Sequence, residues 1–229
     1  MAWHHNRGET SRITTRKEEL LKYLVARGIA KSPKVISSFR AVPREEFVPP
    51  RLRDHAYDDC PLPIGYGQTI SAVHMTLIMN EALELEPGHK VLEIGAGSGY
   101  HAALISEIVG PDGHVFTIEI VPELVEFARK NLSRANYSGR VTVIHGNGSL
   151  GYPREAPYDR ILVTAAAPKV PNSLLDQLLP TGTIVIPVGT IYLGQRLVRV
   201  RKREDGTLTE EDLGSVVFVP LRGKEGWQF

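Results

Sequence analysis

The residues best suited to chemistry lie around three alternate glycines near the middle of the chain. Gly95, Gly97 and Gly99 follow the apolar run Val91–Ile94, within the pattern Glu-x-Gly-x-Gly-x-Gly. Glycine tolerates the positive backbone angles of a tight loop, and the free amides that open a following helix favour an anionic group. We therefore expect the stretch Lys90 to Tyr100 to form a strand, a loop and the start of a helix that together bind a nucleotide-like ligand.

The spacing of the glycines separates this loop from the common nucleotide loops. A dinucleotide fingerprint needs a third glycine at position 100, which is Tyr100, and the Gly-Lys pair of a Walker loop is absent. Glu93 ends the strand beside the loop, where its carboxylate would repel a pyrophosphate. It suits a ligand with an amino group or a sulfonium cation, and S-adenosylmethionine has both. Glu93 and the three glycines are therefore predicted to bind S-adenosylmethionine.

Two further strand ends complete the predicted cofactor site. Glu119 ends the next strand, with Ile120 after it, and a carboxylate there can accept both hydroxyls of a ribose. A solvated strand-end acid is the plainer alternative. Asn147 and Gly148 end the third strand, where the amide can pair with an adenine edge, although a simple Gly-Asn turn explains it equally well. Together with Glu93, these strand ends are expected to contact the methionine, ribose and adenine parts of the cofactor.

A second polar loop runs from Gly65 to Met75. Ser71 lies where a helix N-cap residue would lie, so capping alone could explain it. Polar side chains on a glycine-rich backbone are, however, typical of functional loops. His74 is expected to be a half-buried packing residue, and since no carboxylate is seen to complete a triad with it, serine-hydrolase chemistry is discounted.

The fourth strand ends in Thr164-Ala165-Ala166-Ala167-Pro168, which offers a small apolar space and little that could act as a base. A carboxylate acceptor needs no base, because its pKa of roughly 3.5 to 4 leaves it ionised at neutral pH. Catalysis would then depend on holding a carboxylate oxygen in line with the sulfonium methyl. Hydroxyl donors such as Ser71 and Thr69 would serve that positioning.

Composition sets the class of protein. The chain has 229 residues, 42% of them hydrophobic, and a formal net charge of +1, which suits one globular domain. The near-neutral charge argues against nucleic-acid binding, and no apolar run could span a bilayer. Cys60 is the single cysteine, so neither a disulfide within the chain nor a cysteine metal cluster is expected, and no metal site is predicted. The first residues lack the apolar segment of a secretory signal, and a cytoplasmic location is expected.

Periodicity predicts the elements that position these residues. Residues 1–14 are expected to be a frayed terminus, Thr15 and Glu18 a capping box that starts a helix ending at Gly28, and Pro33 the start of a second helix. The segment 42–67 is expected to cross the surface as part of a binding wall. Strands are predicted at 91–94, 114–120, 141–145, 160–164 and 183–188, and helices at 101–109, 122–135 and 170–179. This alternation predicts a mostly parallel sheet.

The last part of the chain reads as two strands on either side of Glu204-Asp205-Gly206, which predicts an antiparallel edge hairpin. Its basic run includes Arg199, Arg201, Lys202 and Arg203. We interpret the run as a solvated edge that deters aggregation, with contact to acidic peptides as the functional alternative. The predicted organisation is one catalytic domain over 1–229, made of a helical and substrate-loop segment (1–80), a cofactor-binding core (81–190) and C-terminal strands (191–229).

The chain resembles the protein-L-isoaspartate (D-aspartate) O-methyltransferase family. The motifs that carry the resemblance are Val42 to Pro49, Gly67-Gln68-Thr69-Ile70-Ser71-Ala72, Val91 to Tyr100, Ala156 to Arg160, and Val219-Pro220-Leu221. The glycine loop is shared with many methyltransferases, whereas the Gln-Thr-Ile-Ser-Ala loop is particular to this family. The similarity covers nearly all of the chain beyond the first ten or so residues.

The resemblance implies a Rossmann-like S-adenosylmethionine-dependent methyltransferase fold with an N-terminal helical extension. It implies transfer of methyl to the free α-carboxylate of isoaspartyl residues in damaged proteins and peptides, with S-adenosyl-L-homocysteine as the product. The methyl ester then closes to a succinimide, whose hydrolysis partly restores the normal linkage. By matching position, Ser71 is the family's active-site serine. Thr69 and Ile70 lie beside the ligands, and His74 and Val219 lie near the substrate.

Two departures from the family pattern stand out. Val73 replaces the usual proline before the motif histidine, which could loosen the start of the helix, and Asn147 replaces the usual aspartate, which removes a charge near adenine. Two other functions stay open on the sequence. One is an S-adenosylmethionine-dependent O-methyltransferase of another carboxylate, and the other is a binding module for the cofactor that transfers nothing.

Overall fold

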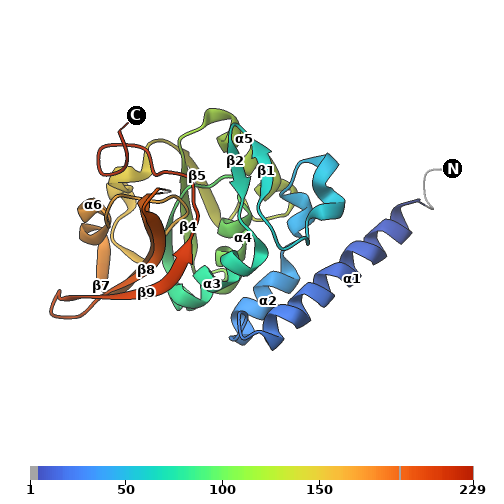
Figure 1. Ribbon diagram of the computed structural model, residues 1–229, viewed down its shortest axis with the longest axis horizontal. Helices are drawn as coiled ribbons and strands as arrows, with labels where there is room; N and C mark the ends of the chain where they lie inside the picture. Colours follow the sequence, from blue (N-terminus) through green and yellow to red (C-terminus); the bar gives the residue numbers. More distant parts are fainter. Residues whose placement is uncertain (1–4, 191, 229) are drawn as a thin grey trace.

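The computed structural model describes residues 5–190 and 192–228, with side chains from Arg12 onward. Within these residues a seven-stranded sheet has the order β5-β4-β3-β6-β7-β8-β9 (Figure 1). The first five strands in that order are parallel and the last two pairings are antiparallel. The strands are β3 (Lys90–Ile94), β4 (His114–Glu119), β5 (Val141–His145), β6 (Tyr158–Val163), β7 (Leu178–Thr190), β8 (Gly194–Lys202) and β9 (Leu208–Val216). The predicted mostly parallel sheet with an antiparallel C-terminal hairpin is confirmed.

Helices cover the sheet and extend from it on one side, where α1 and α2 lie (Figure 1). They are α1 (His5–Ala26), α2 (Pro33–Ala41), α3 (Val73–Leu83), α4 (Tyr100–Val109), α5 (Pro122–Arg134) and α6 (Asn172–Asp176), with 3-10 turns η1 (Arg44–Glu46), η2 (Pro50–His55), η3 (Gly148–Leu150) and η4 (Pro153–Glu155). Alternate residues of β3 enter different clusters. Val91 packs with the helical side, and Leu92 and Ile94 pack with the other. Both faces of the sheet are therefore buried, as parallel strands require.

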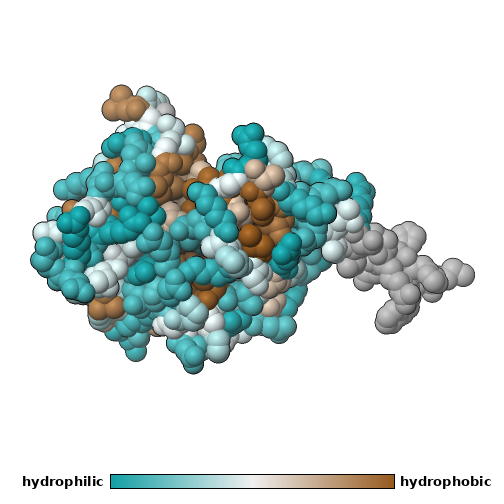
Figure 2. Space-filling view, turned by 90° about the horizontal axis from the view of Figure 1, so that it is seen from below, coloured by the Kyte–Doolittle hydropathy of each residue, from teal (hydrophilic) through white to brown (hydrophobic). Residues whose placement is uncertain are grey.

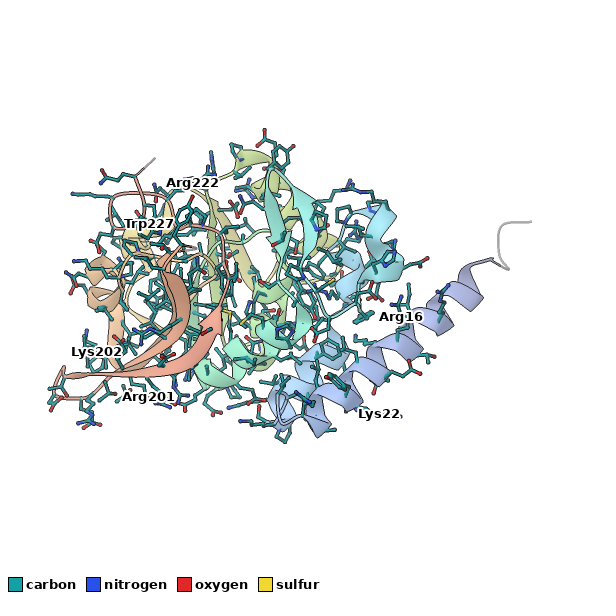
Figure 3. The ribbon with its side chains drawn as sticks, viewed as in Figure 1. Arg16, Lys22, Arg201, Lys202, Arg222 and Trp227 are labelled. Carbon is teal, nitrogen blue, oxygen red and sulfur yellow. The ribbon has the colours of Figure 1, made fainter. Side chains whose placement is uncertain are left out.

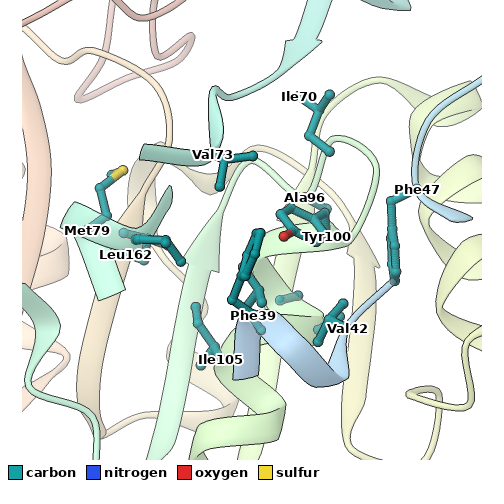
Figure 4. Packing of buried hydrophobic residues seen from close by; sticks show 14 of the residues in the cluster. Phe39, Val42, Phe47, Ile70, Val73, Met79, Ala96, Tyr100, Ile105 and Leu162 are labelled. Atoms are coloured by element: carbon teal, nitrogen blue, oxygen red, sulfur yellow. The ribbon is translucent and has the colours of Figure 1, made fainter. Parts of the chain in front are cut away.

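The helical side of the core joins the N-terminal extension to the sheet. Phe39 of α2 and Tyr100 of α4 pack in one cluster with Leu162 of β6 (Figure 4). All three are buried. The extension is therefore part of the same hydrophobic core as the sheet.

The N-terminal helix begins earlier than the sequence indicates. Helix α1 starts at His5, so the expected frayed terminus over 1–14 is wrong for residues 5–14, and residues 1–4 lie outside the described residues. The proposed capping box at Thr15 falls inside this helix. A polar helical stretch gives no apolar stripe, which is why its first turns were missed. The predicted end is right, because Gly28 has φ +66° and its amide donates to Val25.

The segment 42–67 contains more regular structure than expected. It holds η1 and η2 and ends in β1 (Leu62–Gly65), which pairs with β2 (Gln68–Ile70). Tyr66 and Gly67 both have positive φ, at 53° and 69°, and connect the two strands in a two-residue turn. The glycine-rich start of the second polar loop is therefore a hairpin turn that holds β2 in place.

Two element boundaries also differ near the end of the sheet. The helix predicted at 170–179 is shorter, since α6 covers Asn172–Asp176, and β7 is longer than the predicted 183–188. Strand β7 already pairs with Tyr158 at Leu178, which takes the end of the predicted helix into the sheet.

The C-terminal hairpin uses its basic side chains internally. Arg199 pairs with Glu84 and Glu211, and Arg201 pairs with the same two carboxylates. Lys202 donates to the backbone carbonyl groups of Leu175 and Leu178 at 3.0 and 2.9 Å. Arg201 and Lys202 lie near the end of β8 (Figure 3). Because the two arginines already have acidic partners, this edge offers little free charge to acidic peptides.

None of the helices among the described residues is long and apolar enough to cross a membrane. The face seen in Figure 2 is largely hydrophilic, with hydrophobic side chains gathered in a few areas between the polar ones.

Candidate active site

The glycine loop between β3 and α4 has the geometry that the sequence predicts. Gly95, Gly97 and Gly99 have φ values of +99°, +52° and +85°. A Cβ atom on Gly95 would lie 2.3 Å from the hydroxyl oxygen of Thr164, so a side chain there meets a neighbouring strand end. Both the backbone angle and the lack of space therefore require glycine at position 95.

Glu119 binds the glycine loop from the end of β4. Its Oε2 accepts from the amide of Gly97 at 2.9 Å, and its Oε1 accepts from the amides of Ile120 and Val121 at 2.9 and 3.0 Å. The side chain is 6% exposed and lines a cavity. The carboxylate thus orders the loop and the start of α5, a second task that the ribose prediction did not include. Lone pairs left on Oε2 can still accept a hydroxyl.

Glu93 does not reach the cavity, contrary to the expectation that its carboxylate faces the loop. The side chain is fully buried, Oε2 accepts from the hydroxyl of Thr117 on β4, and Oε1 has no partner among the described residues. Burial raises the pKa of Glu93 to about 8, so the group is largely protonated at neutral pH. The side chain is also absent from the cavity lining, so direct contact with a cofactor amino group does not follow from this geometry.

Asn147 forms a turn and stays outside the cavity. Its Oδ1 accepts from the amide of Ser149 at 3.0 Å and caps η3, while the neighbouring Gly146 and Gly148 line the cavity. A Cβ on Gly223 would lie 2.4 Å from Asn147 Oδ1, so the C-terminal segment passes close beside this exposed side chain. The arrangement favours the turn interpretation over pairing with an adenine edge.

Ser71 lies between β2 and α3, and it does not cap the helix. The N-cap residue is Ala72, without a side-chain cap, and no hydrogen bond from the Ser71 hydroxyl is found among the described residues. Helix α3 begins at Val73, which is fully buried, so the missing proline does not prevent the helix from starting there. Ser71 and Thr69 both line the cavity beside the glycine loop. The capping explanation of Ser71 is therefore wrong.

His74 has a carboxylate partner that the sequence analysis missed. Asp59 Oδ1 lies 2.9 Å from Nδ1 of His74 and accepts from the His74 amide at 2.8 Å. The aspartate therefore anchors the first turn of α3 and orients the imidazole ring. The two residues are 15 positions apart and meet only because the β1–β2 hairpin folds back, which sequence spacing alone does not reveal.

Two cavities meet at Ser71. We call them the inner cavity, beside the glycine loop, and the outer cavity, beside α3 and the residues after β9. The inner cavity is lined by Gln68–Ser71, Thr76, Ile94–Ser98, Tyr100, His101, Ile118–Val121, Gly146, Gly148, Thr164, Ala165 and Val219–Arg222. The outer cavity is lined by Pro61, Thr69, Ser71, Ala72, His74, Met75, Thr164 and Ser215–Pro220. Thr69, Ser71, Thr164, Val219 and Pro220 face both.

Most of the predicted site residues come together at these cavities. Thr69, Ile70, Ser71, Gly95, Gly97, Glu119, Ile120, Gly148 and Val219 line the inner one, and His74 lines the outer one. Glu93, Gly99 and Asn147 line neither. Gly99 is nonetheless the N-cap residue of α4, and a Cβ added there would lie 3.0 Å from Leu132.

Beyond Val219, which the resemblance placed near the substrate, the sequence analysis missed the part of the wall formed by the C-terminal segment. Ala166 accepts from the amide of Leu221 at 2.9 Å and from the indole Nε1 of Trp227 at 2.9 Å. These bonds hold Arg222 beside the inner cavity; Figure 3 shows Trp227 and Arg222 together at this end of the molecule. The segment has no periodicity, so only the family motif Val219-Pro220-Leu221 and the alanine run after β6, with which it pairs, could have indicated it.

Thr164 is a second missed residue. Its hydroxyl donates to the carbonyl oxygens of Ile94 at 3.0 Å and Gly95 at 2.9 Å, and the side chain faces both cavities. A threonine before the alanine run was read as part of an inert loop. Its hydrogen bonds instead fix the position of the first loop glycine.

The inner cavity fits an S-adenosylmethionine-like ligand. Gly95 and Gly148 bring their backbone to its wall, and a Cβ on either would clash with Thr164 at 2.3 Å or with Ile94 at 2.5 Å, so both positions require glycine. A buried acid at the end of β4, Glu119, can accept hydroxyl groups. The loop and the start of α4 supply backbone amides at the same edge of the sheet, where such sheets bind nucleotides.

Comparison with known proteins supports the interpretation of the inner cavity as a methyltransferase cofactor site. The family model for protein-L-isoaspartate(D-aspartate) O-methyltransferase matches residues 15–226. A protein-L-isoaspartate O-methyltransferase of Methanopyrus kandleri is 56% identical over 212 residues, covering 93% of each chain. One from Hyperthermus butylicus is 54% identical and covers 93% of this chain and 90% of its own.

Solved structures agree with the sequence relatives. A crystal structure assigned to the protein-L-isoaspartate O-methyltransferase of Plasmodium falciparum, in complex with S-adenosyl-L-homocysteine, matches with a TM-score of 0.79 at 28% identity. The match covers 89% of this chain and 97% of that one. Another protein-L-isoaspartate O-methyltransferase matches with a TM-score of 0.81 at 29% identity, covering 92% of this chain and 67% of that one.

Proposed function

Because the chain belongs to the protein-L-isoaspartate(D-aspartate) O-methyltransferase family, we propose that it repairs damaged proteins by methylating isoaspartyl residues. The methyl group comes from S-adenosylmethionine, and the acceptor is the free α-carboxylate of L-isoaspartyl residues in proteins and peptides. The observation that carries the proposal is the meeting of two cavities at Ser71, one fitted to a nucleoside and the other open beside α3.

The inner cavity would hold the cofactor. Glu119 would accept ribose hydroxyls, the loop of Gly95 and Gly97 would lie against the methionine part, and the backbone at Gly146 and Gly148 would lie against adenine. When bound, S-adenosylmethionine supplies a methyl group on a positively charged sulfur, and S-adenosyl-L-homocysteine is what leaves.

The outer cavity would hold the peptide. Val219, Thr69 and His74 form its wall, and Ser71 faces both cavities, so its hydroxyl can donate to the acceptor carboxylate. The small side chains Thr164 and Ala165 border the inner cavity and supply no base. None is required, because a carboxylate is already an anion at neutral pH. The residues of this site therefore act by holding the acceptor oxygen in place.

Asp59 would support the same site through its hydrogen bonds to His74. Its carboxylate orients the His74 ring, at 2.9 Å, and holds the start of α3 beside Ser71. We propose that His74 contacts the substrate peptide rather than the reacting oxygen. A role for an aspartate-oriented histidine as a base is not needed here.

The test is methyl transfer from labelled S-adenosylmethionine to two synthetic peptides that differ only in an aspartyl or isoaspartyl linkage. The proposal predicts label on the isoaspartyl peptide alone. Label on small carboxylic acids and on neither peptide would favour another carboxylate methyltransferase. Cofactor binding by calorimetry without any transfer would favour a binding module. Neither alternative is favoured by the relatives described above.

The proposal extends to organisation and location. We propose that residues 1–229 act as one catalytic unit, since side chains of α1, α2 and the sheet share one core. The partners would be proteins and peptides that contain isoaspartyl residues. A cytoplasmic location is proposed on the sequence features alone, and fractionation of cells with an antibody to the chain would test it.

A further inference from the structure

Arg44 is a wholly buried arginine in the segment before the β1–β2 hairpin. Its side chain is 0% exposed. Nε donates to the carbonyl oxygen of Ala56 at 2.8 Å, and Nη2 donates to the carbonyl oxygen of Ser71 at 2.7 Å. The backbone of Ser71 is therefore held from the protein interior, while its side chain faces the two cavities.

The same guanidinium group contacts the start of α4, directly after the glycine loop. Its Cζ atom lies 4.9 Å from the ring centroid of Tyr100, the first residue of α4 after Gly99. Phe47 packs on the same tyrosine ring, with centroids 5.6 Å apart, and Figure 4 shows both rings in the core beside α4. Arg44 thus contacts the loop that carries Ser71 and the helix start that carries the glycine loop.

Stability alone explains this arginine poorly. No carboxylate forms an ion pair with it among the described residues, and Nη1 has no hydrogen-bond partner there. Burial lowers the pKa of Arg44, which shows the cost of keeping the charge inside. Buried charged groups are in general weak evidence for a role in stability, because taking the charge out of water costs free energy that its partners only partly repay. The buried guanidinium group is therefore better explained by its two directed hydrogen bonds, to the carbonyl oxygens of Ala56 and Ser71.

We propose that Arg44 is a positioning residue that sets the separation between the Ser71 loop and the glycine loop. This inference rests on the proposed function, because that separation is the distance between the acceptor carboxylate and the methyl donor. A displacement of about 1 Å far from the reacting atoms can cost on the order of 10²-fold in rate. Arg44 touches neither ligand and acts through the carbonyl of Ser71 and the ring of Tyr100.

The experiment compares Arg44→Met and Arg44→Lys with a matched control, Arg160→Met. Arg160 also donates from its side chain to backbone carbonyl groups, those of Leu83, the last residue of α3, and of the C-cap Glu84, at the opposite end of that helix. Three quantities are measured: kcat/KM with an isoaspartyl peptide, the Kd of S-adenosylhomocysteine, and amide hydrogen exchange over residues 68–72.

The proposal predicts a drop in kcat/KM of about 10²-fold for Arg44→Met and a smaller drop, about tenfold, for Arg44→Lys. It predicts faster exchange over 68–72 in both Arg44 variants, with exchange over those residues unchanged in Arg160→Met. A loss in the Arg160→Met control as large as in Arg44→Met would overturn it. If Arg44→Met does not fold, Arg44→Lys decides the question alone.

A double-mutant cycle with Ser71→Ala separates positioning from general loosening. If Arg44 acts through Ser71, the penalty of Arg44→Met shrinks about tenfold or more when Ser71 is already alanine. An equal penalty in both backgrounds contradicts the proposal. Failure of the proposed function is distinguishable, because it would appear as no transfer by the wild type, while hydrogen exchange would still report whether Arg44 holds the loop.

Discussion

The carboxylate of Glu119 and the amide of Gly97 are hydrogen bonded at 2.9 Å, which joins the end of β4 to the glycine loop of the neighbouring strand. The other oxygen of Glu119 accepts from the first residues before α5. One buried acid therefore orders the loop and remains at the cavity wall for a ligand hydroxyl.

Replacing Glu119 with glutamine should weaken cofactor binding. An amide can accept from only one of these backbone directions, and a hydrogen bond to a charged group contributes about 1.5–3 kcal/mol. We expect the Kd for S-adenosylhomocysteine, measured by calorimetry, to rise about tenfold to hundredfold. Glu123→Gln, on the exposed first turn of α5, serves as the control. Equal affinity in the two variants would show that Glu119 does not support the ligand.

Gly95→Ala tests the close approach of the loop to β6. The new Cβ would lie 2.3 Å from Thr164 Oγ1, at a residue with φ +99°. Gly110→Ala is a matched control, because Gly110 also has positive φ, at +70°, but has open space around its Cβ position. Backbone strain costs about 1–3 kcal/mol in each variant. Thermal unfolding should show a larger loss for Gly95→Ala, partly relieved by adding Thr164→Ala. Equal losses in the two variants would show that contact with Thr164 does not destabilise Gly95→Ala.

Glu93 should make stability depend on pH. Its pKa is raised from 4.5 in the unfolded chain to about 8 by burial. A raised pKa contributes stability that is fully present below pH 4.5 and is lost as the pH rises through about 8. Glu93→Gln removes this dependence. The free energy of unfolding of the variant relative to wild type, from denaturant titrations, should therefore rise by a few kcal/mol between pH 5 and pH 8.5. A constant difference, like that expected for the exposed Glu19→Gln, would contradict burial as the cause.

Asn147→Ala should affect the turn more than the cofactor. The side chain caps η3 and lies outside the inner cavity. Loss of such a cap costs about 1 kcal/mol. We expect a lower unfolding temperature and a Kd for S-adenosylhomocysteine within about threefold of wild type. A change larger than tenfold in affinity, without loss of stability, would restore the adenine-contact interpretation.

The elements of the fold follow from local patterns where the apolar periodicity is strong. The strand over 141–145 was placed to the residue, and the strand over 91–94 and the helix over 122–135 were each placed to within one residue. The first turns of α1 were missed because they carry no apolar stripe. Strand β1 was missed because it has only four residues and contains a proline, although their burial alternates.

The site could be predicted only where a single segment defines it. The positive φ angles of the glycine loop follow from residue types, and Ser71 was singled out from its loop. The contacts that place these segments join residues far apart in the chain: Asp59 with His74, and Arg44 with Ser71. No local pattern contains them. Glu93 was predicted to face the loop because it lies near the end of a strand. That position fixes where the side chain begins, but not which face of the sheet it occupies.

The most direct test of the central claim is the effect of Ser71→Ala on kcat/KM for an isoaspartyl peptide, measured beside the Kd for S-adenosylhomocysteine. Ser215→Ala, which also lines the outer cavity but not the inner one, is the matched control. We predict a loss of about tenfold to hundredfold in kcat/KM for Ser71→Ala alone, with its cofactor Kd within about threefold of wild type. Unchanged kcat/KM in Ser71→Ala would contradict the claim that Ser71 holds the acceptor where the two cavities meet.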